Sequence, residues 1–128
     1  MLKPFHFALI GVGNAGTVIA KALLQAGNQC SFFVSKTAKG KIRTKKNFKN
    51  IAQIYSHISQ VSKEYWIHLD IIIIAVPDDS ISFVGNELAK LNKNLFKKPV
   101  LVFHLSGCKK STEIPKLSWG FRASFHPC

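Results

Sequence analysis

The 128-residue sequence carries 18 lysines and arginines against 6 aspartates and glutamates, which gives a formal net charge of +12. Its hydrophobic content of 47% is that of a globular protein, and its length is that of one domain. The longest apolar run, Ile71 to Pro77, is far short of the roughly 20 residues that a membrane-spanning helix needs, and no secretory signal is evident. We therefore expect a single cytoplasmic domain that has no membrane attachment.

Three cysteines, Cys30, Cys108 and Cys128, have no Cys-x-x-Cys spacing, and their odd number gives no disulfide framework. We predict no metal site. Cys30 is expected to be a small buried residue within a strand. Cys108 follows a Ser-Gly pair and is a candidate reactive thiol, although no base partner is identified for it.

The chain begins with an apolar run, a glycine cluster and a helical pattern. We predict a strand from about Phe5 to Val12 and a helix from about Ala15 to Ala26. Between them, Gly11-Val12-Gly13-Asn14-Ala15-Gly16 matches the G-x-G-x-x-G pattern at the position that dinucleotide binding requires. The expected buried face of the helix consists of Val18, Ile19, Ala22, Leu23 and Ala26, and Gly27 is the expected C-terminal cap.

Each glycine of this turn has its own physical role in the dinucleotide-binding interpretation. Gly11 permits a tight turn out of the strand, Gly13 lets the backbone approach a pyrophosphate, and Gly16 lets the helix pack closely on the sheet. The unpaired amides and the positive dipole end of the helix would then bind the anion. The alternative is a glycine-rich turn that holds no ligand.

The end of the second predicted strand, Gln29 to Ser35, bears on the choice of cofactor. An NAD-specific domain carries an acid about 20 residues beyond the glycines, which bonds the ribose 2′-hydroxyl. Here that place holds Ser35, Lys36 and Thr37, and cations and hydroxyls suit a 2′-phosphate. The sequence therefore favours NADP over NAD.

A basic segment follows this strand, with no carboxylate between residues 36 and 49. Its cations are Lys36, Lys39, Lys41, Arg43, Lys45, Lys46 and Lys49. Lys36, with Lys39, is placed near the ligand by the end of the strand. We expect Lys41 to Lys49 to be a solvated, mobile loop.

The middle of the chain predicts further strand and helix pairs. Between Ile51 and Lys63 we favour a short strand, Ala52 to Tyr55, followed by a helix, although a single helix also fits the spacing. The run from Asp70 to Pro77 is the clearest strand, and it should lie next to the first strand. A helix should then extend to about Asn92. Its N-cap candidates are Asp78, Asp79 and Ser80, and its expected inner face is Ile81, Val84, Leu88 and Leu91.

The last elements are a strand at Pro99 to His104 and another at Phe121 to His126. Ligands of open α/β sheets lie beyond the carboxyl ends of the strands, so Val76, Pro77, His104 and Ser106 should face the nicotinamide. His104 and Ser106 are also the candidates for a catalytic role. His104 could bond the ribose or carboxamide, could move a proton, or could equally cap the turn that follows its strand.

Four motifs together carry a resemblance to a known family. They are Gly11-Val-Gly-Asn-Ala-Gly16, Ala75-Val-Pro-Asp-Asp79, His104-Leu-Ser-Gly107 and Ser124-Phe-His-Pro127. Across nearly the whole chain they resemble the Rossmann-like domain of NADP-dependent oxidoreductases related to pyrroline-5-carboxylate reductase and deazaflavin-dependent NADP reductases. The resemblance implies a doubly wound α/β domain with a mainly parallel sheet and helices on both faces. It places Gly11, Gly13, Asn14 and Ala15 at the pyrophosphate, Ser35 and Lys36 at the 2′-phosphate, and Val76, Pro77, His104 and Ser106 at the nicotinamide.

In the closest branch of that family, a helical domain of unknown function follows this one and would begin where the present sequence ends. The resemblance implies that the helical domain completes the substrate cleft and the dimer. We therefore expect residues 1–128 to form the cofactor domain alone, acting as a homodimer or with a partner that supplies the missing domain.

The leading functional hypothesis is an NADP(H)-binding domain of an oxidoreductase that transfers hydride to or from a small substrate. The alternative is a non-catalytic module that senses NADP(H) or passes it to a partner protein. A methyltransferase is disfavoured because its cofactor usually requires an acid where Ser35 and Lys36 stand. Nucleic-acid binding by residues 36–49 is a further alternative that we do not expect, and it would show as salt-sensitive affinity without nucleotide competition.

Overall fold

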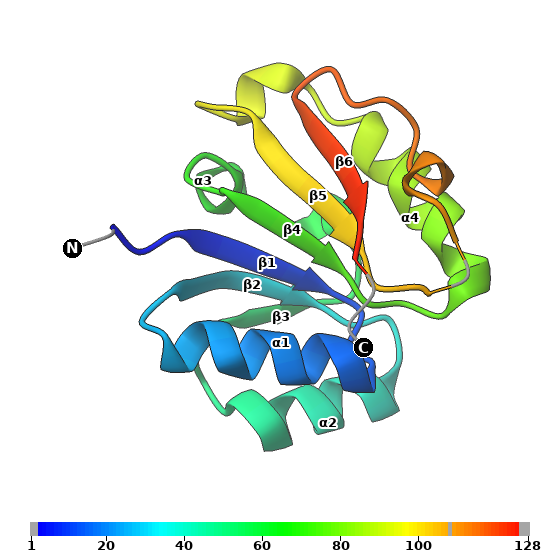
Figure 1. Cartoon of the computed structure of the whole chain (residues 1–128). Coiled ribbons are helices and arrows are strands. Elements are labelled where there is room, and N and C mark those ends of the chain that lie inside the picture. The colour runs from blue at the N-terminus through cyan, green and yellow to red at the C-terminus, as the bar shows by residue number, and fades with distance from the viewer. Residues whose placement is uncertain (1–2, 108, 126–128) are drawn as a thin grey trace.

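Strands and helices alternate along the described chain, which is residues 3–107 and 109–125 of a computed structural model (Figure 1). The strands are β1 (His6–Ile10), β2 (Gln29–Val34), β3 (Gln53–Tyr55), β4 (Ile71–Ile74), β5 (Val100–His104) and β6 (Gly120–Ser124). The α-helices are α1 (Asn14–Gln25), α2 (Ala38–Phe48), α3 (Lys63–Trp66) and α4 (Asp78–Ala89). Three short 3₁₀ turns are η1 (Ile58–Gln60), η2 (Lys93–Leu95) and η3 (Ser111–Glu113).

All six strands are parallel and lie in the order β3-β2-β1-β4-β5-β6. This is the doubly wound order, in which the chain winds outward from β1 in one direction and then, from β4, in the other. The predicted fold class is confirmed, and so is the predicted neighbour of the first strand, because β1 pairs with β4. The order reverses between β1 and β4, and this crevice is where such sheets bind ligands.

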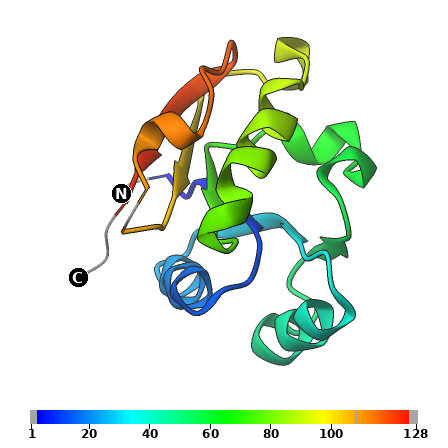
Figure 2. The same cartoon turned by 90° about the vertical axis from the view of Figure 1, so that its right-hand side faces the viewer.

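Helices lie on both faces of the sheet (Figure 2), and the sheet separates two clusters of apolar side chains. One cluster lies under α1 and α2 and contains Phe7, Leu9 and Phe33. The other lies under α3 and α4 and contains Trp66 and Leu88. The central strands are buried on both faces, which explains why their sequences read as continuous apolar runs.

The predicted buried face of α1 is wrong in part. In α1 the buried residues are Gly16, Thr17 and Ala20, whereas Val18 is 67% exposed. Ile19 and Leu23 pack against the cluster as expected, while Ala22 and Ala26 are exposed. The helix is rotated because Gly16 has no side chain and lets this face of the helix approach the sheet. Gly27 follows the C-cap with a φ of +92°, as expected of a glycine at this position.

Residues 41–49 are not the mobile loop that we expected, because most of them belong to α2. Thr37 caps this helix, and Thr44 and Phe48 are buried one turn apart on its inner side. Phe48 packs against the Phe33 ring with the centroids 4.7 Å apart. Burial of this side holds the helix on the sheet, while the cations on the other faces stay solvated.

The remaining elements differ from the predictions mainly at their ends. The short strand before residue 56 is confirmed as β3, but the helix expected after it is replaced by η1 and the four-residue α3. The N-cap of α4 is Pro77, so the prediction of an aspartate or serine cap is wrong. Asp78 and Asp79 lie in the first turn, where their charge favours the helix. The expected inner residues of α4 are buried or packed on the core, and residue 126, the end of the last predicted strand, lies outside the described chain.

Candidate functional site

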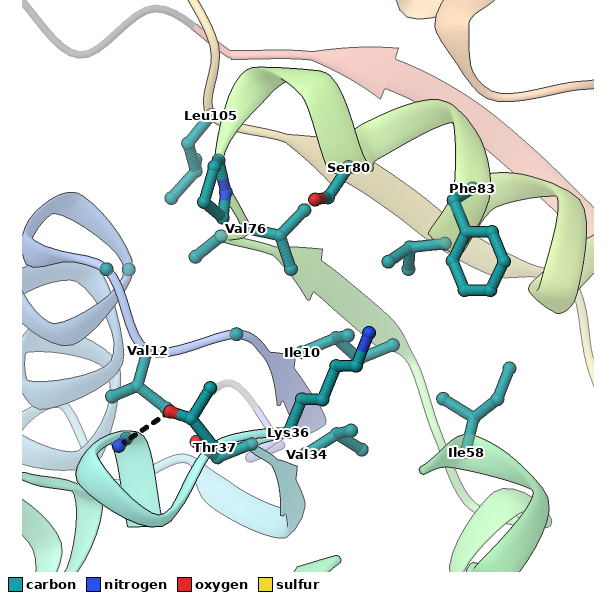
Figure 3. A pocket seen from close by; sticks show the side chains of 18 of the residues that line it. Ile10, Val12, Val34, Lys36, Thr37, Ile58, Val76, Ser80, Phe83 and Leu105 are labelled. Atoms are coloured by element: carbon teal, nitrogen blue, oxygen red, sulfur yellow. Dashed lines mark hydrogen bonds between the residues drawn. The ribbon is translucent and has the colours of Figure 1, made fainter. Parts of the chain in front are cut away.

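The carboxyl ends of the central strands open into a cavity of about 740 Å³ (Figure 3). Its lining comes from the glycine turn, from the β2 end and α2, from residues 56–59, from the turn between β4 and α4, and from residues 105 and 106. Its volume is within the range of small-molecule and cofactor sites, roughly 300–1,000 Å³. The cavity lies at the switch point of the sheet, where the sequence predicted the ligand.

The glycine turn is tied to the two strands that flank β1. The Gly11 N–H donates to Val34 O over 2.8 Å, and the Gly13 N–H donates to Ala75 O over 3.3 Å. Gly11 has a φ of +81°, and a Cβ there would come within 2.8 Å of the Ala75 carbonyl. The turn is therefore fixed by backbone geometry that a side chain at Gly11 would break.

The start of α1 offers backbone donors to the cavity. The first intrahelical acceptor, Gly13 O, receives the N–H of Thr17 over 2.9 Å, so the amides of residues 14–16 have no partner within the helix. The N-cap makes no side-chain hydrogen bond, and the first turn holds no acid. Asn14, Ala15 and Gly16 all line the cavity. Unpaired amides at the positive end of a helix dipole bind anions, so this end of the cavity fits linked phosphates.

The adjoining wall is formed by the β2 end and the first turns of α2. Thr37 accepts a hydrogen bond from the Gly40 N–H at 2.9 Å, shown by the dashed line in Figure 3. Ser35 is buried beneath that turn, and a Cβ at Gly40 would lie 2.3 Å from its hydroxyl oxygen. Lys36 is exposed and extends into the cavity (Figure 3). The wall thus presents a cation and hydroxyls where an NAD-specific domain would carry an acid.

At the other end of the cavity, Val76, Pro77, Leu105 and Ser106 line the surface. His104 does not. It is fully buried, its Nε2 lies 2.7 Å from Lys110 O, and its Nδ1 accepts the Ser106 N–H at 3.2 Å. Because Nδ1 accepts, Nε2 carries the proton and donates to the Lys110 carbonyl.

Of the two readings of His104, the structure therefore supports the one in which it caps the turn. Both ring nitrogens are used inside the protein, so His104 is not placed to touch a nicotinamide or to exchange a proton with a substrate. Its expected contact with the cofactor stays a prediction that the cavity lining does not support. Its effect on the site is indirect, through the position of Leu105 and Ser106.

Several cavity residues were missed in the sequence. Arg43 reaches the site from α2, and its guanidinium donates a hydrogen bond to the side-chain oxygen of Asn14. Ile58 and Phe83 form an apolar rim, and the Phe83 ring is 60% exposed (Figure 3). Arg43 belongs to the basic segment seen in the sequence. Only the position of α2 in the structure shows that Arg43 lines the cavity.

The cysteines and other ionisable groups give no second site in the described part of the chain. Burial raises the pKa of the Cys30 thiol to about 12, although its hydrogen bond to Phe32 O acts in the opposite direction, so this thiol stays protonated. Cys108 and Cys128 lie outside the described residues. Within the described ranges, no group of His, Cys, Asp or Glu side chains is arranged to hold a metal ion. No described helix has the length and apolarity to cross a membrane.

A parallel sheet in this order, with a glycine turn and a free helix N-terminus at its switch point, defines an NAD(P)-binding Rossmann domain. The chain belongs to the family described as "NADP oxidoreductase coenzyme F420-dependent", which it matches over residues 6–102. It is thus a Rossmann domain of the oxidoreductase type, in agreement with the resemblance seen in the sequence.

Solved structures share this fold at low sequence identity. The putative NADP oxidoreductase BF3122 from Bacteroides fragilis is 18% identical with a TM-score of 0.74, over 98% of this chain and 44% of that one. Prephenate dehydrogenase from A. aeolicus was crystallised with hydroxyphenyl propionate and NAD+. It is 15% identical with a TM-score of 0.67, over 88% of this chain and 38% of that one. 3-Hydroxybutyryl-CoA dehydrogenase from Escherichia coli is 16% identical with a TM-score of 0.67, over 98% of this chain and 30% of that one. The chain spans less than half the length of each of these proteins, and no curated protein matches its sequence.

Proposed function

We propose that the cavity binds NADP(H) and that the chain is the cofactor domain of an oxidoreductase that moves hydride to or from a small substrate. The observation that carries this proposal is the wall at the end of β2. Ser35, Lys36 and Thr37 line the cavity there, and among the described residues of the lining the carboxylates are Asp78 and Glu87 of α4. A dianionic 2′-phosphate suits this wall better than a neutral hydroxyl does.

In this proposal the residues act in three groups along the cofactor. Gly11, Gly13, Asn14, Ala15 and Gly16 form the turn that receives the pyrophosphate. Ser35, Lys36 and Thr37 receive the 2′-phosphate. Val76, Pro77 and Ser106 lie beside the nicotinamide, which supplies the hydride chemistry when bound.

Ser106 is the remaining candidate for a polar contact with the nicotinamide or a substrate. It is buried, it lines the cavity, and its hydroxyl accepts the Lys109 N–H over 3.2 Å. His104 fixes the backbone amide of the same residue. This arrangement holds Ser106 in one position, as a residue that orients a ligand must be held.

The structural neighbours do not decide between the two nicotinamide cofactors. The A. aeolicus enzyme was crystallised with NAD+, while BF3122 is described as an NADP oxidoreductase, and both share this fold. The fold therefore accommodates either cofactor. The local chemistry of Ser35, Lys36 and Thr37 is what favours NADP in this chain.

Thermal-shift titrations with NADPH, NADH and S-adenosylmethionine test the proposal. We expect the largest stabilisation from NADPH and none from S-adenosylmethionine. Lys36→Glu should reduce the NADPH effect, whereas Lys46→Glu, at an exposed position of α2 outside the cavity, should leave it nearly unchanged. Equal stabilisation by NADH and NADPH would refute the 2′-phosphate assignment. Binding of NADPH without turnover over a panel of substrates would favour the non-catalytic alternative.

A further inference from the structure

We infer that Arg43 is a second cationic arm of the 2′-phosphate site and that Asn14 holds it in position. This inference rests on the proposed function, because it assigns a further specificity residue to the same cavity. Arg43 lies on α2 and lines the cavity, and its guanidinium donates to the Asn14 side-chain oxygen. Asn14 is the first residue of α1, beside the amides proposed for the pyrophosphate.

The position of Arg43 is set by the packing of two helices. The Lys21 ammonium donates to the Asn47 side-chain oxygen over 2.9 Å, and the Asn47 amide donates to Arg43 O over 3.0 Å. Asn14 and Lys21 are two turns apart on α1, while Arg43 and Asn47 are one turn apart on α2. Two hydrogen bonds therefore join the helices, Lys21 to Asn47 and Arg43 to Asn14. The second of these is at the start of α1, beside the glycine turn.

The opposite side of α2 prevents the helix from turning Arg43 away. Thr44 and Phe48 are buried there, and the Thr44 hydroxyl donates to Gly40 O over 2.7 Å. Since Thr37 caps the helix at its start, both the rotation and the beginning of α2 are fixed. Arg43 is thereby held facing α1, where it contacts Asn14.

The chemistry of this contact leaves Arg43 available to an anion. A guanidinium has five N–H donors, and the side-chain oxygen of Asn14 is a neutral acceptor. Within the described residues, no carboxylate forms an ion pair with Arg43. A phosphate oxygen offers a charge-assisted and bidentate partner, which is stronger than the bond to an amide. Asn14 thus orients the guanidinium without neutralising it.

Binding constants for NADPH and NADH, measured with Arg43→Gln and the matched variant Lys46→Gln, test this inference. Both variants lose one positive charge of α2, but residue 46 does not line the cavity. We expect Arg43→Gln to raise the Kd for NADPH by about ten- to a hundredfold and the Kd for NADH by less than about twofold. Lys46→Gln should change both by less than about twofold. Arg43→Lys, which keeps the charge and loses the bidentate geometry, should fall between wild type and Arg43→Gln.

The outcomes separate this inference from the proposed function. If wild type prefers NADPH and Arg43→Gln leaves that preference unchanged, the second arm is refuted while the 2′-phosphate site stands. An equal loss for NADPH and NADH would place Arg43 at the pyrophosphate and would also refute it. If wild type itself shows no preference, the proposed function fails and this inference fails with it. An unchanged melting temperature of Arg43→Gln confirms that the variant is folded.

Discussion

Gly16 and Ala75 lie in direct contact, with the first turn of α1 set against the end of β4 so closely that a Cβ on Gly16 would fall 2.3 Å from the Ala75 Cβ. Leu9 Cδ1 would be 3.2 Å from the same added atom. This contact explains why the packing of α1 on the sheet requires a glycine at the third glycine position of the turn. It also joins the glycine turn to the end of β4.

The first prediction follows from this contact. Gly16→Ala should lower the free energy of unfolding by about 1–3 kcal/mol, the usual cost of overpacking, as measured by urea denaturation. Ala75→Gly in the same chain should restore part of the loss, because it removes the atom that the new methyl group meets. If Gly16→Ala is as stable as wild type, the close approach of α1 to β4 is wrong.

The second prediction concerns the cap of α2. Thr37→Ala removes the acceptor of the Gly40 N–H and should destabilise the chain by about 1 kcal/mol, whereas Thr37→Ser keeps the hydroxyl and should be close to wild type. Urea denaturation measures both variants. Because Thr37 also lines the cavity, Thr37→Ala should weaken the binding of NADPH more than the binding of NADH. A stable Thr37→Ala variant would show that the cap contributes little.

The third prediction distinguishes a turn-capping His104 from one that contacts the cofactor. His104→Ala leaves the Ser106 N–H and the Lys110 carbonyl without their partner, at a cost of about 1–3 kcal/mol for each group that stays buried. His68→Ala, at an exposed histidine, should stay within about 0.5 kcal/mol of wild type. Chemical denaturation compares the two. Full stability of His104→Ala with a large loss of nucleotide affinity would instead indicate direct contact.

The fourth prediction concerns Asp70, at the opposite end of the sheet from the cavity. Burial by itself raises the pKa of its carboxyl, but the hydrogen bonds from Lys98 and the His6 N–H and the nearby charges outweigh burial and lower the pKa. A carboxyl whose pKa is lower in the folded state stabilises the fold above its unfolded value, near 3.9, and loses that effect as the pH falls through the folded pKa. Wild type should therefore lose stability as the pH falls below about 5, until the pH has passed the folded-state pKa.

Asp70→Asn removes the titrating group, so its stability deficit relative to wild type should be larger at pH 7 than at pH 3. Thermal unfolding across this range measures the difference. Lys98→Gln keeps the carboxyl and removes its ammonium partner, and should flatten the wild-type dependence in part. A deficit for Asp70→Asn that is independent of pH would contradict the assignment.

The parts of the fold that the sequence predicted are those fixed by local chemistry or by complete burial. Strands β1 and β4 are covered on both faces and therefore appear as apolar runs. The glycine turn was readable because its spacing, the preceding strand and the following helix all indicate the same structure. The sequence did not predict which face of α1 is buried. Val18 satisfies the helical pattern, but Gly16 decides which face approaches the sheet.

The elements that the sequence did not predict depend on contacts between distant residues. For α2, the run of cations suggested a solvated loop, although lysine and arginine are good helix formers and Thr44 and Phe48 supplied a thin buried face. The role of His104 was open because its acceptor, Lys110 O, is on a loop whose path the pattern does not determine. The pairing of Arg43 with Asn14 joins residues 29 positions apart and requires α2 to be placed first.

The glycine turn and the cationic wall use different parts of the chain, and this division has an evolutionary consequence. The turn acts through backbone amides and strand contacts, so it is indifferent to which nicotinamide cofactor is present. The wall consists of a few side chains at the end of β2 and on α2, where substitutions at the exposed Lys36 or Arg43 leave the core untouched. A lineage could therefore exchange one coenzyme for the other in a few mutational steps while keeping the same scaffold.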